Sequence, residues 1–293
     1  ALKGKSAPRG KSLSRRFKKE KELWFWSAFA VAWWVVFFLI PLYGITYSFF
    51  DYVPGRPVTW DRFVGLDNFI DFFETREAPL VIRNTLVIGG LNMTIGFCCP
   101  IILALLFDEL KSTKLKRVAQ TISYLPYFVS WVVVASILNS FLSSEGVISQ
   151  VLVSLGLMDK PVSFLTVGPY FWPIIVIANI WKGVGWDTIL YMSAIAGIDQ
   201  ELYEAGAVDG LGRWGMVRYI TLPSILPTIV LLFIMGIGNV LNLGYEVNLL
   251  LGQPTTRDYW EIIDTYVYRY GIQLGRQSFA IAVGLMKSVI GLI

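Results

Sequence analysis

The chain has 293 residues, of which 55% are hydrophobic and only 16% are charged, and its mean hydropathy is +0.58. This composition excludes an ordinary soluble domain and indicates a protein that folds in a bilayer. The sequence contains no histidine, the commonest general base and metal ligand, so hydrolytic chemistry and a metal site are not expected in this chain.

Residues 1–22 form a basic tail, because they hold nine Lys or Arg against Glu20 and Glu22. Beside an apolar segment, such a tail is typical of a cytoplasmic end that contacts anionic membrane lipid. A basic tail can also bind nucleic acid, but we set that alternative aside because the apolar segment follows directly. We therefore expect a tail at 1–22 and a transmembrane domain at 23–293.

Six apolar segments follow the tail, and the first five are each long enough to cross a bilayer as a helix. The predicted fold is therefore all-α and integral to the membrane, with about six transmembrane helices. Pro41 is expected to kink the first of them. The last has about 17 residues where roughly 20 are needed, so we expect it to be truncated here. The predicted spans are 24–50, 84–107, 118–142, 171–196, 222–245 and a last one from near 277.

The charges of the connections predict a cytoplasmic amino terminus. The loop at 108–117 is basic, whereas the loop at 51–83 is rich in Asp and Glu, and basic residues favour the cytoplasmic side. The loops at 51–83, 143–170 and 246–276 are then external, and they are too short for an independent domain.

The cytoplasmic loop at 197–221 breaks this charge rule, because it is acidic, so a cytoplasmic partner is expected to recognise it. Asp199 is predicted to cap a short helix that runs to about Asp209, and Gly210 permits a turn after it. A second short helix is expected next, followed by Pro223 in the first turn of the fifth span.

The short helix is predicted to present a small, weakly apolar face that fits a cleft of another protein, with Glu201 and Glu204 projecting beside it. An amphipathic helix that lies on the membrane is the alternative, and the helix alone does not decide between the two. The members of the face are Leu202, Ala205, Gly206 and Val208.

The wider pattern favours the first interpretation. Glu204-Ala205-Gly206, then Asp209-Gly210 and Ile220-Thr221-Leu222-Pro223, resembles the EAA loop of importer permeases, which is Glu-Ala-Ala, three residues, Gly, nine residues and Ile-x-Leu-Pro. Gly206 stands where Ala is usual, which should loosen the helix by roughly 0.5–1 kcal/mol without changing its surface.

Over about residues 23–293, the chain is thus similar to the permease subunits of bacterial ATP-binding-cassette (ABC) importers. The segments at 181–188, 238–246 and 263–268 resemble the oligosaccharide and polysaccharide branch of that family and, within it, an alginate importer permease. The resemblance implies a multi-pass subunit of the bacterial plasma membrane, the inner membrane in a Gram-negative host, that alternates between outward-facing and inward-facing forms.

The resemblance also implies partners. In that family a second, related permease completes the pathway, two ATPase subunits bind the EAA loops, and an external or periplasmic binding protein delivers the oligosaccharide. The chain has no Gly-x-x-x-x-Gly-Lys-Ser/Thr loop, so ATP and Mg are expected on the ATPases, with no cofactor, metal or catalytic residue here. The implied coupling residues are Glu201, Tyr203, Glu204, Ala205, Gly206, Ala207, Asp209 and Gly210.

The external loops are expected to contact the binding protein, because they are too small to collect substrate themselves. Four of their side chains are predicted to be exposed for this purpose, although the aromatic ones also suit a role as anchors at the membrane interface. These residues are Trp60, Arg76, Arg257 and Trp260.

Polar and aromatic residues within or beside the predicted spans are candidates for the substrate path, which needs amides and flat walls to match sugar hydroxyls and rings. On the fifth span, three polar residues at +3 and +4 should form one stripe, with interhelical hydrogen bonding as the alternative. The candidates are Trp181, Lys182, Trp186, Asp187, Tyr191, Asn239, Asn242, Tyr245, Glu246 and Lys287, with the stripe at 239, 242 and 246.

Two lysines are expected near mid-membrane depth, where a charge costs about 2.5–3.5 kcal/mol. If Lys182 and Lys287 line the cavity, they favour an acidic sugar. If Asp187 neutralises one of them through a neighbouring helix, the lysines have a structural role. Lys182 and Asp187 themselves lie about 140° apart around one helix, so they do not pair on one face.

Two other function classes fit the sequence less well. A secondary transporter or a channel explains charges in the membrane but not an acidic EAA-type loop. A membrane-embedded enzyme needs a nucleophile, a base or metal ligands clustered at one depth, and no such cluster stands out in the sequence.

Overall fold

The computed structural model describes residues 21–292, so nearly all of the predicted tail lies outside the described residues. Within that range the backbone is helical, apart from loops and one isolated bridge between Phe50 and Phe63. Helices suit an apolar chain in a bilayer because they satisfy backbone polar groups within one segment. The predicted all-α membrane fold is confirmed.

The helices range from short turns to long segments. In chain order the α-helices are α2 Lys21–Trp34, α3 Ile40–Leu42, α4 Asp67–Glu74, α5 Ala78–Leu91, α6 Phe97–Asp108, α7 Thr113–Tyr124, α8 Trp131–Leu142, α9 Val147–Ser154, α10 Phe171–Ala196, α11 Gln200–Val208, α12 Arg213–Met216, α13 Leu222–Asn239, α14 Glu246–Leu251, α15 Arg257–Trp260, α16 Ile263–Tyr268 and α17 Gln277–Leu292. The π-turns and 3₁₀ turns that continue them include η1 Val35–Leu39, η2 Tyr43–Phe49, η4 Asn92–Gly96, η5 Leu125–Phe128, η8 Val217–Thr221 and η10 Arg269–Gln273.

Within residues 21–292, four helical stretches are long and apolar enough to cross a membrane. α10 has a comparable length of 26 residues but carries several polar side chains, and α17 has 16 residues. The number of six crossings therefore stays a prediction. The four stretches are Lys21–Phe49, Ala78–Asp108, Trp131–Ser154 and Arg213–Asn239.

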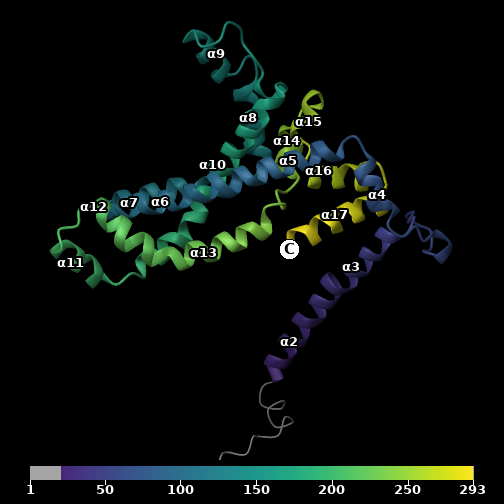
Figure 1. The fold of residues 1–293 in the computed structure, drawn as a ribbon, viewed down its shortest axis with the longest axis horizontal. Coiled ribbons are helices and arrows are strands. Elements are labelled where there is room, and N and C mark those ends of the chain that lie inside the picture. The colour runs from purple at the N-terminus through teal and green to yellow at the C-terminus, as the bar shows by residue number, and fades with distance from the viewer. Residues whose placement is uncertain (1–20, 293) are drawn as a thin grey trace, which may run out of the picture.

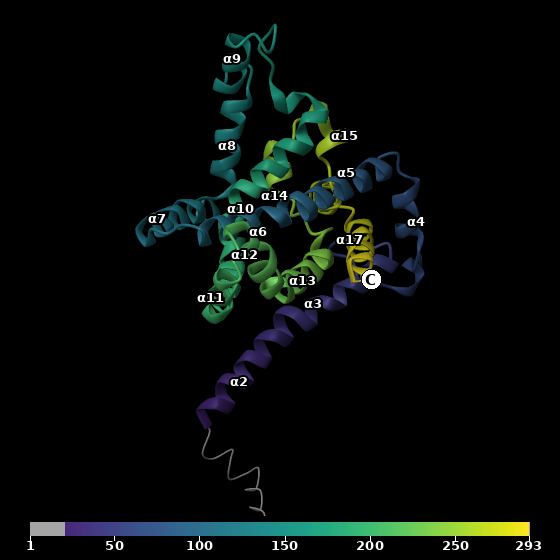
Figure 2. The ribbon, with the colours of Figure 1, turned by 60° about the vertical axis from the view of Figure 1, so that its left-hand side comes forward.

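The molecule is elongated, with α11 and α12 at one end of the long axis and α4 at the other (Figure 1). α8 and α9 leave this axis, and α2 projects from the body (Figures 1 and 2). The apolar side chains of α2 are exposed in the single chain. Pro41 lies in the short α3, which follows the π-turn η1 and precedes the 3₁₀ turn η2, so the first helix changes its geometry around this proline.

The third predicted span, 118–142, is wrong as a single helix. η5, which continues α7, ends at Phe128. Val129 after it is extended, and α8 then starts in a new direction. Pro126 has no N–H to continue the helix, and the Ser130 hydroxyl accepts from the amide of Val133 at 3.4 Å, so the sequence favours a stop and a new N-cap.

The fifth predicted span has different bounds from those expected. α12, η8 and α13 form one continuous helix, so this span begins at Arg213 and Pro223 lies inside it. The helix ends at Asn239, and Gly244, with φ of +72°, turns the chain into α14. The expected stripe of Asn239, Asn242 and Glu246 on one helix is therefore wrong.

α10 is the central helix, and it packs against α6, α7 and α13. A side chain at Gly185 would collide with the carbonyl oxygen of Ser123, so only glycine lets α10 and α7 approach this closely. On the same helix the buried Thr188 hydroxyl donates to the carbonyl oxygens of Val184 at 2.6 Å and Pro100 at 3.3 Å. These contacts fix α10 as a rigid support for its polar side chains.

The end of the molecule near α4, α15 and α16 is held by a partly buried charge network. Arg269 donates to Glu261 and Glu77, each at 2.7 Å, and the Glu261 side chain is only 4% exposed. Burial acts to lower the pKa of Arg269, but the hydrogen bonds with these carboxylates raise it overall, so the guanidinium stays charged. Asn84 donates to the carbonyl oxygens of Asp258 at 3.0 Å and Glu261 at 2.9 Å.

The prediction of an exposed Trp260 is wrong, because this side chain is only 6% exposed. Its indole N–H donates to the carbonyl oxygen of Gln253 at 2.7 Å, and its ring lies against Gly252, where a Cβ would collide. Trp60, in contrast, is 83% exposed, and Arg76 and Arg257 are exposed as expected.

Candidate functional site

The loop at 197–221 forms the short helix that the sequence predicts. A carboxylate oxygen of Asp199 accepts from the amide of Glu201 at 3.1 Å, and Glu201 in the first turn complements the positive end of the helix dipole. α11 ends at Val208, and Gly210 has φ of +77°, a left-handed conformation that glycine adopts at little cost.

α11 exposes a stripe made of Leu202, Ala205 and Val208, which are three residues apart. Val208 is 88% exposed. The prediction that Gly206 belongs to this face is wrong, because Gly206 is buried. A Cβ there would lie 2.7 Å from Cδ1 of Ile220, so the glycine allows α11 to pack on its own chain.

The other side of α11 is tied to the membrane helices. The Tyr203 hydroxyl lies 2.9 Å from Oγ1 of Thr221 in η8. Arg213 at the start of the fifth span forms an ion pair with Glu109 of the neighbouring loop, 3.8 Å between Nε and Oε2. Among the predicted coupling residues, Tyr203, Glu204 and Ala207 line a hollow of about 700 Å³ on this side, while Asp209 is exposed after the last turn.

The sequence analysis missed one large exposed side chain beside α11. Trp214 in α12 is 84% exposed, and α11 and α12 lie at the same end of the molecule (Figure 1). Trp214 and the exposed Val208 are therefore two large apolar side chains that the single chain leaves uncovered at this end. The signal in the sequence was a lone tryptophan among polar and small residues.

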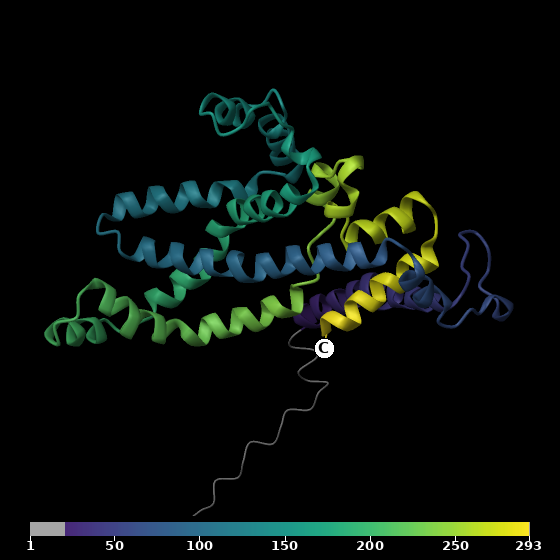
Figure 3. The same cartoon turned by 45° about the horizontal axis from the view of Figure 1, so that its top comes forward.

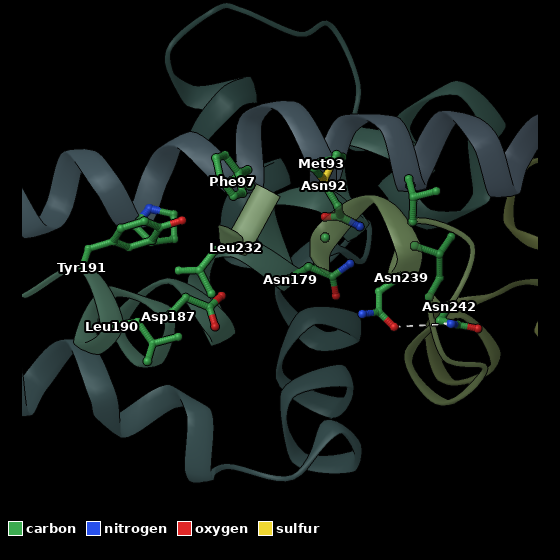
Figure 4. A pocket seen from close by; sticks show the side chains of 16 residues that line it. Asn92, Met93, Phe97, Asn179, Asp187, Leu190, Tyr191, Leu232, Asn239 and Asn242 are labelled. Atoms are coloured by element: carbon green, nitrogen blue, oxygen red, sulfur yellow. Dashed lines mark hydrogen bonds between the residues drawn. The ribbon is translucent and has the colours of Figure 1, made fainter. Parts of the chain in front are cut away.

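A cavity of about 500 Å³ lies between α10, α13 and the second span near η4. Asn92, Asn179, Asn239 and Asn242 gather toward one end of it, with Asp187 toward the other (Figure 4). Nδ2 of Asn242 donates to Oδ1 of Asn239 at 3.4 Å. The remaining lining is mainly apolar and includes Tyr191, Met93 and Phe97.

The cavity brings together four of the ten predicted path residues: Asp187, Tyr191, Asn239 and Asn242. Asn92 and Asn179 were missed. For Asn179 a signal existed, because residues 179, 183, 187 and 191 are each four apart and therefore share one face of α10.

The aromatic candidates and Glu246 lie elsewhere. Trp181 lines a separate apolar pocket of about 430 Å³ with α8 and α9. Trp186 stacks on Tyr127 with ring centres 4.5 Å apart. Tyr245 stacks on Tyr268 at 5.1 Å, and Glu246 is exposed in the first turn of α14. None of these four side chains lines the polar cavity.

Lys182 stabilises the chain where α7 and η5 end and α8 begins. Its ammonium donates to the carbonyl oxygens of Tyr127 at 2.6 Å, Val129 at 2.7 Å and Pro126 at 3.4 Å. These carbonyls lose their helical partners where the helix stops, and a cation at a helix C-terminus also suits the dipole. The rings of Tyr127 and Trp131 lie over the same ammonium.

Lys287 forms a half-buried ion pair with Asp264 of α16, and Asp264 also accepts from the amide of Gly244 at 3.1 Å. The expectation that Asp187 neutralises one of the two lysines is therefore wrong, because the acid that pairs with Lys287 is Asp264 and neither lysine forms an ion pair with Asp187. Neither lysine lines the polar cavity. Within residues 21–292, no group of three or more Cys, Asp or Glu side chains could hold a metal ion.

Comparisons with known proteins agree with this arrangement. Residues 96–293 match the family model of the binding-protein-dependent transport system inner membrane component. Protein LplB of Bacillus subtilis is 40% identical over 98% of this chain and 90% of its own length. The polygalacturonan/rhamnogalacturonan transport system permease protein YteP of the same species is 40% identical over 89% of this chain and 81% of its own.

A bacterial ABC transporter that imports the acidic polysaccharide alginate contains a chain of the same fold. In its crystal structure the match has a TM-score of 0.88 and 37% identity, and it covers 96% of this chain and 95% of that one. In a complex of the alginate transporter with a periplasmic protein bound to an alginate pentasaccharide, the TM-score is 0.87, also at 37% identity, over 96% and 94% of the two chains. The chain described here belongs to the family of binding-protein-dependent transport system inner membrane components, the membrane-spanning permeases of ABC transporters.

Proposed function

We propose that the chain is a permease subunit of a bacterial ABC importer for oligosaccharides or polysaccharides. The observation that carries the proposal is the loop at 197–221, where an Asp-capped helix exposes an apolar stripe and ends in a glycine turn. The polysaccharides named for YteP and for the alginate transporter support the substrate class. A secondary transporter or a channel gives no reason for this exposed stripe.

In this proposal the chain works in a larger assembly. A second, related permease forms the other half of the pathway, two ATPase subunits dock on the coupling helices, and an external binding protein delivers the sugar. ATP and Mg²⁺ bind to the ATPases, and this subunit supplies no catalytic residue and no cofactor. The apolar surface of α2, exposed in the single chain, has room for lipid or for the second permease.

The amino terminus is cytoplasmic in this proposal, and the protein lies in the bacterial plasma membrane. The end of the molecule with α11 and α12 then faces the cytoplasm, and the end with α4 faces outward. Figure 3 supports this assignment, because the loops expected inside were 108–117 and 197–221, and the connections that the structure has there, α6 to α7 and α10 to α12, lie at the same end of the long axis. The basic residues of the loop at 108–117 favour the same orientation.

α11 is the proposed coupling helix. Leu202, Ala205 and Val208 form the docking stripe, and Trp214 extends it on α12. Small side chains permit close approach to a cleft. The hydrogen bond between the hydroxyls of Tyr203 and Thr221 then couples a displacement of α11 to the fifth span. Gly206 contributes by letting α11 lie close to that span.

The polar cavity is the proposed contribution of this subunit to the substrate path. Its asparagine amides can donate and accept hydrogen bonds, which suits sugar hydroxyls, and Tyr191 adds a flat apolar surface. α13 links this cavity to the coupling loop, because the fifth span runs without interruption from Arg213 to Asn239. Motion of the loop is therefore conveyed to the cavity wall.

Two substitutions in the complete, reconstituted importer test the coupling assignment. Ala205→Trp should lower ATP-driven sugar import at least tenfold, because a large ring on the docking stripe prevents close approach. Gly210→Val should act similarly, because valine is strained at φ of +77°. The matched control is Gly212→Val, since Gly212 has φ of −73° and open space around it. Normal import by assembled complexes of the first two variants would contradict the proposal.

A further inference from the structure

Asp187 carries the only charge among the described residues that line the polar cavity. Within residues 21–292, no Lys or Arg forms an ion pair with it. Its neighbours in the lining are amides, Tyr191 and apolar side chains, and Figure 4 shows the carboxylate directed into the space beside Leu190 and Leu232. The cavity is therefore acidic on the side that this chain supplies.

The two membrane lysines do not offset this charge. Lys182 donates to three carbonyl oxygens at the α7–α8 break, on a different face of α10 from Asp187. Lys287 is paired with Asp264 beside α16. Both lysines thus bind groups of this chain. They do not make the cavity electropositive, which is the condition for favouring an acidic sugar.

From this geometry we infer that Asp187 is a specificity-determining residue, which accepts hydrogen bonds from the hydroxyls of an uncharged sugar unit and repels a sugar carboxylate. The inference rests on the proposed function of the cavity as part of a sugar path. A carboxylate is a strong acceptor for two hydroxyl donors at once, whereas two carboxylates at close range repel one another.

The amide end of the cavity acts differently. Asn92, Asn179, Asn239 and Asn242 carry no charge, and their N–H groups can donate to a hydroxyl or to a carboxylate. Discrimination by charge is therefore localised at Asp187. An acidic polysaccharide needs cations from another subunit to pass this position.

The test uses the complete importer in lipid vesicles, with initial import rates measured for a neutral glucose trimer and for a galacturonate trimer. The preference of the binding protein cancels when each variant is compared with the wild type. Asp187→Asn should raise the acidic-to-neutral import ratio about tenfold, equivalent to about 1.4 kcal/mol. Asp187→Glu keeps the charge and should leave the ratio low.

Asp159→Asn is the matched control, because it removes one charge from an exposed loop outside the cavity, and it should leave the ratio unchanged. An unchanged ratio in Asp187→Asn, or a parallel fall of both rates with an intact complex, overturns the inference while the proposed function stands. If the wild type imports neither trimer nor any other oligosaccharide, the proposed function itself fails.

Discussion

The two ends of the long axis differ in how far the single chain satisfies its own side chains. At the α15–α16 end, the partly buried Arg269 lies between Glu261 and Glu77, and Trp260 has a hydrogen-bond partner. At the α11–α12 end, Val208 and Trp214 are 88% and 84% exposed. The charge network of the first end is complete within one chain, whereas the second end exposes apolar surface that a partner can bury.

Replacing Arg269, the cation of the charge network at the α15–α16 end, should have the largest effect on stability. Arg269→Met leaves the buried Glu261 carboxylate without its partner, and breaking such a pair typically costs about 3–5 kcal/mol. Denaturant unfolding of the purified protein should show this loss. The control is Arg276→Met, because its pair with Asp71 is about half exposed and should be worth about 1 kcal/mol or less. Similar losses for the two variants would show that the network is not the basis of this end's stability.

A smaller loss is expected at the break between α7 and α8. Lys182→Met removes the donor to three carbonyl oxygens, and hydrogen bonds to a charged group contribute about 1.5–3 kcal/mol. Lys182→Arg should restore part of the stability, since the guanidinium also reaches several acceptors.

The same Lys182 variant separates a structural role from a role in selectivity. Because Lys182 does not line the polar cavity, import of acidic and neutral trimers should fall in parallel in Lys182→Met. A loss confined to the acidic trimer would instead place the Lys182 charge in the substrate path.

A substitution at the α11–α12 end should have the smallest effect on the stability of the chain and a large effect on its assembly with the ATPases. Trp214→Ser removes a ring with few contacts inside the chain, so unfolding should change by less than about 0.5 kcal/mol. Affinity for the ATPase subunits should fall at least tenfold, as is common when an aromatic side chain at an interface is truncated. Binding to the purified ATPase measures this, and an unchanged affinity would remove Trp214 from the docking surface.

Hydropathy located the membrane helices where one apolar run forms one helix. α10 was found at its predicted bounds, and the second span was found at its end but starts at Ala78 rather than at the predicted 84. Length and composition decide the outcome locally for such helices. The third span failed because its apolar composition hid the break, although Pro126 and Ser130 carried the local signal. The continuous helix from Arg213 was missed because Pro223 is compatible with both a helix start and a position after a π-turn.

The candidate site was predictable where it depends on neighbours in the sequence. Asp199 as N-cap and Gly210 as turn follow from local rules, and both were found. The burial of Gly206 depends on Ile220, which lies in the next helix, so periodicity alone could not reveal it. The cavity required α10, α13 and the second span to converge, and the single Asn92 in an apolar run gave no sign of this tertiary arrangement.

Hydrogen exchange of the permease, with and without its ATPase partners, tests most directly the claim that the α11–α12 end is completed by another subunit. Amides of α11 should exchange at least ten times more slowly when the ATPases bind, because docking suppresses local opening of this short helix. Amides of α15 and α16 should be protected in both states. If α11 exchanges at the same rate in the assembled complex as alone, the stripe of Leu202, Ala205 and Val208 is not the docking surface and the account is wrong.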